Sequence, residues 1–103
     1  MVKIILSKIA KSDLREIYNY IKRDSVKYAL LELKKIETTI DKLQSHTFLG
    51  RKSTELKDDL IYELVFQNYK IIYEVLSDRE INILTIHHHA RSITNNPAFT
   101  DED

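Results

Sequence analysis

The chain has 103 residues, 43% of them hydrophobic, and no cysteine, which fits one globular domain and excludes disulfides and thiolate metal sites. Sixteen Lys and Arg balance sixteen Asp and Glu, so the charge does not favour a protein that binds nucleic acid through many phosphates. Since no apolar run is long enough to span a bilayer and no signal-peptide pattern opens the chain, we expect a cytoplasmic protein.

The first part of the chain predicts a strand followed by two helices. Residues 2–6 are a short β-branched run, typical of a strand. Ser7 is placed to cap a helix that ends near Arg23, and Asp24 or Ser25 is placed to cap a second helix that reaches about His46. The apolar residues of the two helices recur at helical spacing, at positions 10, 14, 17, 18 and 21 and at positions 29, 33, 36, 40 and 43. The short link between the helices predicts an antiparallel helical hairpin.

Residues 46–59 are a polar connection that holds Gly50, the only glycine and a natural place for a positive φ. Three apolar runs follow, at residues 60–66, 69–76 and 81–86, and the first two alternate as strands do. Gln67-Asn68 predicts a tight hairpin turn, because Asn tolerates positive φ, and residues 77–79 predict a second turn. Pairing across the first turn places Phe66 opposite Tyr69, Leu64 opposite Ile71 and Tyr62 opposite Tyr73.

These elements predict an α+β fold of order β-α-α-β-β-β, in which a helical hairpin packs on one face of a small, mostly antiparallel sheet. Residues 1–96 form a single domain, with at most a turn of helix at 91–95, and residues 97–103 form an acidic, flexible tail. In this packing Leu33, Ile36 and Ile40 point towards Leu64, Ile71 and Tyr73, which we read as core residues together with Tyr69.

The opposite face of the sheet is predicted to carry both apolar and charged side chains, at positions 61, 63, 65, 70, 72, 74 and 76. An apolar strip of this kind often marks a groove for a partner. The alternative is a face half covered by the first strand or by the tail. The residues alone leave both possibilities open.

Several segments together resemble the RelE/ParE superfamily of toxins from bacterial type II toxin–antitoxin modules. The opening helix AKSDLREIYNYI and the later segments ALLELKKIETTIDKL, LGRKSTEL, YELVFQNYKIIYEV and ILTIHHHAR carry the resemblance, from about Ile4 to Arg91. No single motif is decisive, but their order and spacing are fairly specific. The resemblance implies the fold described above and a cognate antitoxin that holds the toxin inactive. It also implies that operator DNA is contacted only through the antitoxin.

The family has two mechanisms, and the resemblance leaves both possible. RelE-like members cut messenger RNA in the ribosome, whereas ParE-like members poison DNA gyrase and have no established nuclease site. Tyr62 and Val65 stand where many members carry arginines, which weakens the case for an RNA-cutting site. We therefore favour a ParE-like toxin that is not an enzyme, with a ribosome-dependent endoribonuclease as the alternative. A pure interaction module or an inactive toxin is the third possibility.

If the protein is a nuclease, Lys70, His88 and Arg91 are the candidate catalytic residues. Lys70 occupies the family's usual arginine position, where a cation can stabilise charge on a scissile phosphate. His88 and Arg91 match the family's His-x-Ala-Arg ending; the His88 imidazole can serve as a general acid or base, and Arg91 can grip a phosphate or an acidic partner. Each residue also has a structural interpretation, which we favour. Lys70 is then a surface lysine near Glu63, Arg91 ties the end of the sheet to the chain, and His88 is hydrogen-bonded at the sheet rim.

The candidate partner-binding residues are Arg51, Lys52, Glu63, Val65 and Ile72. Arg51 and Lys52 match the family's Gly-Arg segment and can contact an antitoxin or nucleic acid. The other three lie on the half-apolar face of the sheet, which can receive an amphipathic helix or an added strand.

We predict no metal site and no cofactor. Residues 87–89 are three consecutive histidines, but neighbours in a strand point to opposite faces, so at most His87 and His89 share an ion. Two ligands do not make a zinc site, and no nearby Cys or His completes one.

Overall fold

The fold comes from a computed structural model, which describes residues 1–54, 56, 58–88 and 98. In this part of the chain the elements are β1 (Lys3–Leu6), α1 (Lys8–Lys22), α2 (Val26–Asp41), the 3₁₀ turn η1 (Lys42–Gln44), β2 (Arg51–Lys52), β3 (Ile61–Phe66), β4 (Tyr69–Ser77) and β5 (Glu80–His88). The strands form one sheet in the order β1-β5-β4-β3-β2. Only the β1–β5 pair is parallel.

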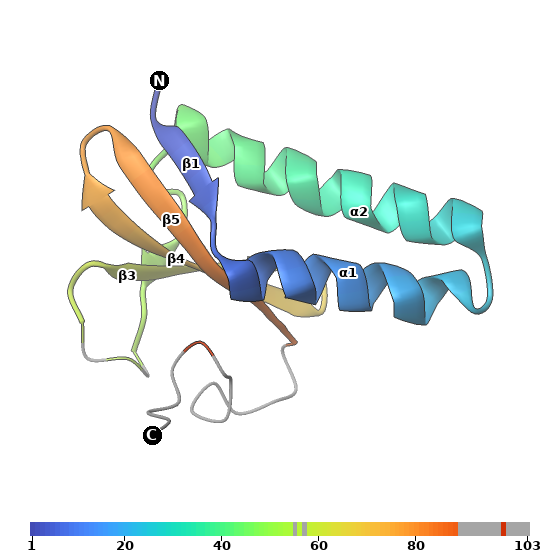
Figure 1. Ribbon diagram of the computed structural model, residues 1–103. Helices are drawn as coiled ribbons and strands as arrows, with labels where there is room; N and C mark the ends of the chain where they lie inside the picture. Colours follow the sequence, from blue (N-terminus) through green and yellow to red (C-terminus); the bar gives the residue numbers. More distant parts are fainter. Residues whose placement is uncertain (55, 57, 89–97, 99–103) are drawn as a thin grey trace.

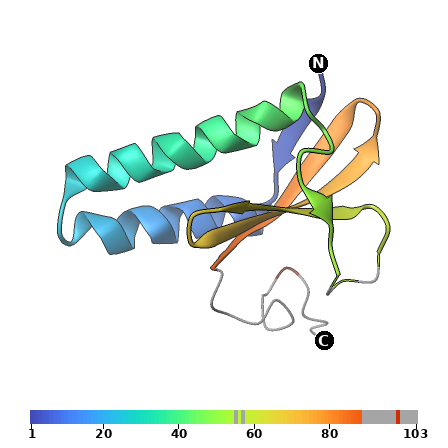
Figure 2. The ribbon, with the colours of Figure 1, turned by 180° about the vertical axis from the view of Figure 1, so that it is seen from behind.

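Both helices lie side by side on one face of the sheet, and the end of the hairpin that carries their connection extends past the strands (Figures 1 and 2). The predicted α+β fold with a helical hairpin on a mostly antiparallel sheet is therefore confirmed. The sequence analysis missed one strand, β2, because two charged residues in a polar connection carry no strand pattern.

Serine side chains cap both helices: Ser7 is the predicted cap of α1, and Ser25 is the one of the two predicted residues, Asp24 and Ser25, that caps α2. The Ser7 hydroxyl accepts a hydrogen bond from the Ala10 N–H at 3.0 Å and donates to the carbonyl of Leu84 at 2.8 Å, so it caps α1 and ties it to β5. Ser25 accepts from the N–H of Tyr28 at 3.1 Å. The second helix is shorter than predicted, because the α-helix ends at Asp41 and η1 continues it as a tighter turn.

The β3–β4 hairpin has the predicted register, with Phe66 opposite Tyr69, Leu64 opposite Ile71 and Tyr62 opposite Tyr73. The turn differs in one detail. The residue with positive φ is Gln67, at 52°, and not Asn68.

Gly50 also differs from its prediction, because its φ is not positive. A Cβ at this position would lie 2.5 Å from the carbonyl oxygen of Glu63, so glycine is needed for close approach of two backbones. The Tyr73 hydroxyl accepts from the Gly50 N–H at 3.1 Å and donates to the carbonyl of Thr47 at 2.8 Å. These bonds hold the connection against the sheet, where β2 pairs with β3.

The register of β4 with β5 shifts between Ile72 and Tyr73, so that Tyr73 pairs with Ile83 while Ile72 pairs with Thr85. Leu84 is the extra residue of this bulge. Ile83 and Ile86 therefore both reach the helix-facing core although they are three residues apart, whereas Leu84 packs on the opposite face.

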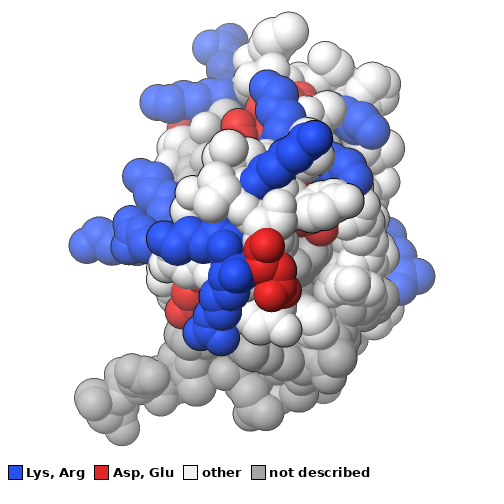
Figure 3. All heavy atoms as spheres, turned by 90° about the vertical axis from the view of Figure 1, so that its right-hand side faces the viewer, with Lys and Arg blue, Asp and Glu red and all other residues white. Residues whose placement is uncertain are grey.

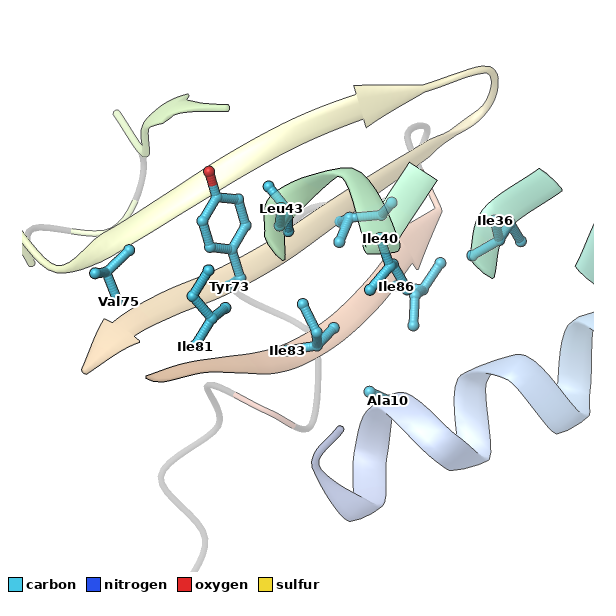
Figure 4. Packing of buried hydrophobic residues seen from close by; sticks show 10 residues of the cluster. Ala10, Ile36, Ile40, Leu43, Tyr73, Val75, Ile81, Ile83 and Ile86 are labelled. Carbon is cyan, nitrogen blue, oxygen red and sulfur yellow. The ribbon is translucent and has the colours of Figure 1, made fainter. Parts of the chain in front are cut away.

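The main core lies between the hairpin and the sheet, and Figure 4 shows how its side chains meet. From the helices come Ala10, Ile36, Ile40 and Leu43, and from the strands come Ile71, Tyr73, Val75, Ile81, Ile83 and Ile86. The prediction that Ile36 and Ile40 face Ile71 and Tyr73 is confirmed. Leu33 is half-buried and is not a member of this cluster.

The opposite face of the sheet corrects one prediction. Ile61 and Ile72 are buried there and form a second small cluster, on which Leu56 and Leu84 pack. Only Val65 and Leu76 of the predicted strip are exposed apolar residues. The centre of this face is therefore not an open apolar strip.

Some predictions fall outside the described residues. These are Arg91, His89, the turn of helix at 91–95, and most of the tail at 97–103.

Candidate functional site

Three ionisable side chains meet on the sheet face opposite the helices. Val65 pairs with Lys70, and Lys70 pairs with His87 on the next strand, while Glu63 lies two residues from Val65 on the same face of β3. Glu63 is 2% exposed and His87 is 4% exposed. Buried ionisable groups in one place are uncommon and are a reason to consider a functional site.

Glu63 is the centre of this cluster. Its Oε1 lies 3.5 Å from Nε of Arg51 and 4.0 Å from Nζ of Lys70. Its Oε2 is buried and accepts no hydrogen bond from the residues that the structure describes. The predicted proximity of Lys70 to Glu63 across the hairpin is thus confirmed, and the lysine balances a buried carboxylate.

Of the three predicted catalytic residues, Lys70 and His88 lie within the described part of the chain, and the structure places them on opposite faces of the sheet. His88 pairs with Tyr69 on the helix-facing side, where the two rings make an edge contact with centroids 6.0 Å apart. Lys70 lies on the other face, beside His87. Because neighbouring strand residues point to opposite faces, Lys70 and His88 cannot act on one phosphate at the same time. Arg91 lies outside the described residues.

The predicted partner-binding residues divide by exposure. Arg51, Lys52 and Val65 are exposed, whereas Glu63 and Ile72 are buried, so the surface that this set offers is narrower than predicted. Contact of these residues with a partner stays a prediction.

Asp13 is a partly buried polar residue that the sequence analysis did not identify. Its Oδ2 accepts hydrogen bonds from the Thr85 hydroxyl and, at 2.9 Å, from the Ile86 N–H, which joins α1 to β5 beyond the end of β1. Burial raises the pKa of the Asp13 carboxyl above 3.8, although these two bonds oppose the rise. Its position three residues after Ala10 and four before Ile17 places it on the apolar stripe, a signal that was available in the sequence.

Among the described residues no three His, Asp or Glu side chains are grouped so that they could hold a metal ion. Within the same residues no helix has the length and apolar character needed to cross a membrane.

The connected end of the helical hairpin is a second surface of interest. Tyr20 is 71% exposed and Tyr28 is 68% exposed. Basic side chains lie near tyrosines of α1: the Arg23 guanidinium lies 5.9 Å from the centre of the Tyr20 ring, and Nζ of Lys22 lies 5.5 Å from that of Tyr18. Figure 3, which looks onto this side of the molecule, shows mostly Lys and Arg among the charged side chains. Exposed aromatic residues with neighbouring cations are common in protein interfaces.

Comparison with known proteins gives a clear family. The family model described as the ParE toxin of type II toxin–antitoxin system, parDE, matches residues 4–93 of the chain. No curated protein sequence matches significantly.

The fold also has a solved counterpart. A structure titled "Chromosomal ParDE TA system from P. aeruginosa" matches with a TM-score of 0.71 and 24% sequence identity. The match covers 85% of this chain and 96% of that one. At this identity the likeness shows a shared fold.

Proposed function

This chain belongs to the ParE toxin family of type II toxin–antitoxin systems, and from that premise we propose that it poisons DNA gyrase and is neutralised by a cognate antitoxin. The toxin binds its target as a protein partner and carries out no chemistry of its own. The family match over residues 4–93 is the observation that carries the proposal. The proposal includes a cytoplasmic location, because that is where gyrase acts.

The arrangement of the ionisable residues supports a binding mechanism over catalysis. Lys70 and His88 lie on opposite faces of the sheet, and Glu63 and His87, which do lie near Lys70, are almost fully buried. A catalytic acid or base must reach the proton that it transfers, which a buried group does not do without movement of its surroundings. The exposed tyrosines and cations at the end of the hairpin offer a surface suited to a protein target.

The antitoxin is the second partner in the proposal. It holds the toxin inactive by covering the surface that the target needs. Operator DNA is then contacted by the antitoxin, consistent with a toxin whose formal net charge is zero.

One specific observation favours a second candidate, a ribosome-dependent endoribonuclease. Lys70 and His87 are direct partners across β4 and β5, and Glu63 lies beside them. A carboxylate, an imidazole and an ammonium group are the types that phosphodiester cleavage uses. The burial of two of the three makes this the weaker candidate.

Expression without the antitoxin separates the two candidates. For the gyrase poison we expect filamentous cells and double-strand DNA breaks while messenger RNA stays intact. Purified toxin should inhibit supercoiling by purified gyrase and trap cleaved DNA. Rapid cleavage of messenger RNA on ribosomes, with intact DNA, would instead establish the nuclease.

A conservative variant sharpens the distinction. Lys70→Arg keeps the positive charge beside Glu63 and adds the fork that binds phosphate, so a nuclease should keep or gain activity. His87→Gln removes the only imidazole on that face among the described residues, and a nuclease that used it should lose most of its activity. A gyrase poison should remain toxic in both variants.

A further inference from the structure

The basic side chains of α1 form a single row along the helix. They follow one another at steps of three, four and seven residues: Lys8, Lys11, Arg15 and Lys22. Because each residue turns a helix by about 100°, these side chains lie within an arc of about 60°. Asn19 fills the gap in the same row, four residues after Arg15 and three before Lys22. All of them are exposed, and together they form the basic row.

The carboxylates of α1 lie outside the basic row. Asp13 is turned towards β5, where it accepts a hydrogen bond from the Ile86 N–H at 2.9 Å. Glu16 follows Arg15 directly, and neighbouring residues of a helix do not face each other. Within the part of the chain that the structure describes, no cation of the row makes an ion pair with a carboxylate.

The stability of the helix does not explain the basic row. Lys8 is the first residue of α1 and Lys11 the fourth, and the first turn contains no acidic residue. The helix macrodipole places partial positive charge at this end, so cations there are unfavourable. Lys11 and Arg15 are also like charges four residues apart, which destabilises a helix. A negatively charged partner would relieve this repulsion.

The second helix has the mixed charges of an ordinary solvated surface. The same steps of three and four residues connect Lys34, Glu37 and Asp41, which are all exposed and include both signs. Side chains at these spacings face each other, so Lys34 has an opposite charge beside it. A row of one sign is therefore a feature of α1 and not of the hairpin as a whole.

The chemistry of the basic row suits phosphate groups better than a protein surface or a membrane. Protein interfaces have an apolar centre from which charges are depleted, whereas the row contains no apolar side chain. The apolar stripe of α1, with Ala10, Leu14 and Ile17, packs in the main core and is not available to a lipid surface. Lys, Arg and Asn side chains all donate hydrogen bonds to phosphate oxygens.

The length of the basic row fits a nucleic-acid backbone. From Lys8 to Lys22 the helix rises about 21 Å. One strand of duplex DNA has a phosphate about every 3.4 Å along the axis, so the row can follow about six successive phosphates. A local row of this kind is compatible with a formal net charge of zero, since it makes few contacts. At the left edge of Figure 3 several Lys and Arg side chains project together.

We propose that the basic row of α1 binds the phosphate backbone of duplex DNA without reading its sequence. The DNA is that held by gyrase and not the operator. This identification rests on the proposed function, whereas phosphate binding rests on the row alone. Lys22 ends the row two residues after the exposed Tyr20, so the row leads to the end of the hairpin that is suited to a protein target. The toxin thus contacts the target protein and its DNA at the same time.

The test compares two triple variants that each lose three exposed cations. The row variant is Lys8→Gln/Lys11→Gln/Arg15→Gln. The control variant is Lys34→Gln/Lys35→Gln/Lys42→Gln. Neither variant changes the tyrosines at the end of the hairpin. The probe is a fluorescent DNA duplex of about 20 base pairs without gyrase, and its anisotropy gives the affinity between about 50 and 200 mM salt.

The salt dependence of binding counts the phosphate contacts. With four contacts the affinity of the wild type should fall about 100-fold over this salt range, and with one remaining contact that of the row variant should fall only about threefold. The control variant should behave like the wild type. Because the row variant loses repulsion, it should be at least as stable to heat as the wild type. Circular dichroism checks folding, and Lys11→Gln/Arg15→Gln replaces the row variant if it does not fold.

A second measurement tests the row in the complex with purified gyrase. The row variant should need at least about tenfold more toxin than the wild type to trap cleaved DNA, because its contact with the DNA is lost. Its affinity for gyrase without DNA should be unchanged. The control variant should match the wild type in both assays.

Three results would overturn the inference and leave the proposed function intact. The first is a wild type that does not bind the duplex at low salt, or row and control variants with the same salt dependence. The second is weaker binding of the row variant to gyrase without DNA, which assigns the row to the protein target. The third is tighter binding of an RNA duplex of the same length, which assigns the row to RNA.

The proposed function can also fail separately. If the wild type binds the duplex through the basic row but does not inhibit gyrase, the proposed target is wrong. Phosphate binding by α1 is then supported, and the identification of the DNA as that held by gyrase is overturned.

Discussion

Nζ of Lys70 lies 4.0 Å from Oε1 of Glu63, a carboxylate that is almost fully buried on the helix-free face of the sheet. Arg51 approaches the same oxygen at 3.5 Å, but its side chain is largely exposed. A buried charge is tolerated when an opposite charge lies close to it, so Lys70 is the more important partner. The sheet thus holds a charge that its surroundings would otherwise disfavour.

Lys70→Met should lower the free energy of unfolding by about 1–3 kcal/mol, because Glu63 then loses its less exposed cation. Urea denaturation at neutral pH measures the change. The exposed neighbour Lys52→Met is the control and should change stability by less than about 0.5 kcal/mol. The double variant Glu63→Leu/Lys70→Met should lose less than Lys70→Met alone, since the buried carboxylate is removed together with its partner. A single variant as stable as wild type would show that the pair contributes nothing.

Gly50→Ala should destabilise the fold by about 1–3 kcal/mol, because its Cβ would lie 2.5 Å from the backbone oxygen of Glu63 and 3.0 Å from the Tyr73 hydroxyl. Thermal unfolding followed by circular dichroism measures the effect. Tyr73→Phe removes the two hydrogen bonds of the same contact without a clash and should cost about 1–2 kcal/mol. If Gly50→Ala were as stable as wild type, the segment around Gly50 would have to move away from the sheet without loss of stability.

Ile36→Ala should cost about 2–5 kcal/mol, because it opens a cavity where α2 meets the sheet. Leu30→Ala, at an exposed position of the same helix, is the matched control and should cost less than about 1 kcal/mol. Denaturant titration of both variants gives the comparison. Similar losses at the two positions would contradict the packing of the hairpin on β4.

Asp13 should give the stability a distinct pH dependence. Because its folded pKa is raised above 3.8, the protonated form is favoured by folding. Its contribution to stability is therefore fully present below pH 3.8 and is lost as pH rises through the raised pKa. The charges that face it are those of Glu16, which raises this pKa, and His87, which lowers it.

The measurement compares wild type with Asp13→Asn by denaturant unfolding between about pH 3 and pH 7. The stability of wild type minus that of the variant should decrease as pH rises across this window. A difference that increases with pH would show that the hydrogen bonds from Thr85 and Ile86 outweigh burial.

Local patterns predicted much of this fold. Alternation in residues 60–66 and 69–76 gave the hairpin and its register, because a strand's side-chain period is two and the turn length fixes the pairing. Serines at positions 7 and 25 gave the helix starts, because their side chains satisfy the first free N–H groups. Both features depend on residues close together in the sequence.

The candidate site was predicted less well. Lys70 was correctly placed near Glu63, but the sequence did not show that His87, and not His88, lies on the same face as Lys70. A stretch of three consecutive histidines contains no signal for which one faces a given side, because that depends on the register of β4 with β5 and on its shifts. The burial of Ile72 likewise depends on Leu56 and Leu84, which are distant in sequence.

The sequence by itself determined both helices, every strand except β2, the hairpin register and the family, because these follow from periodicity, caps and the order of short motifs. Only the tertiary structure decided that Glu63 is buried beside two cations and that Asp13 joins α1 to β5. Each of these depends on segments far apart in the chain that approach one another only when the hairpin packs on the sheet. Local chemistry cannot specify such contacts, because they are set by the packing of the whole core.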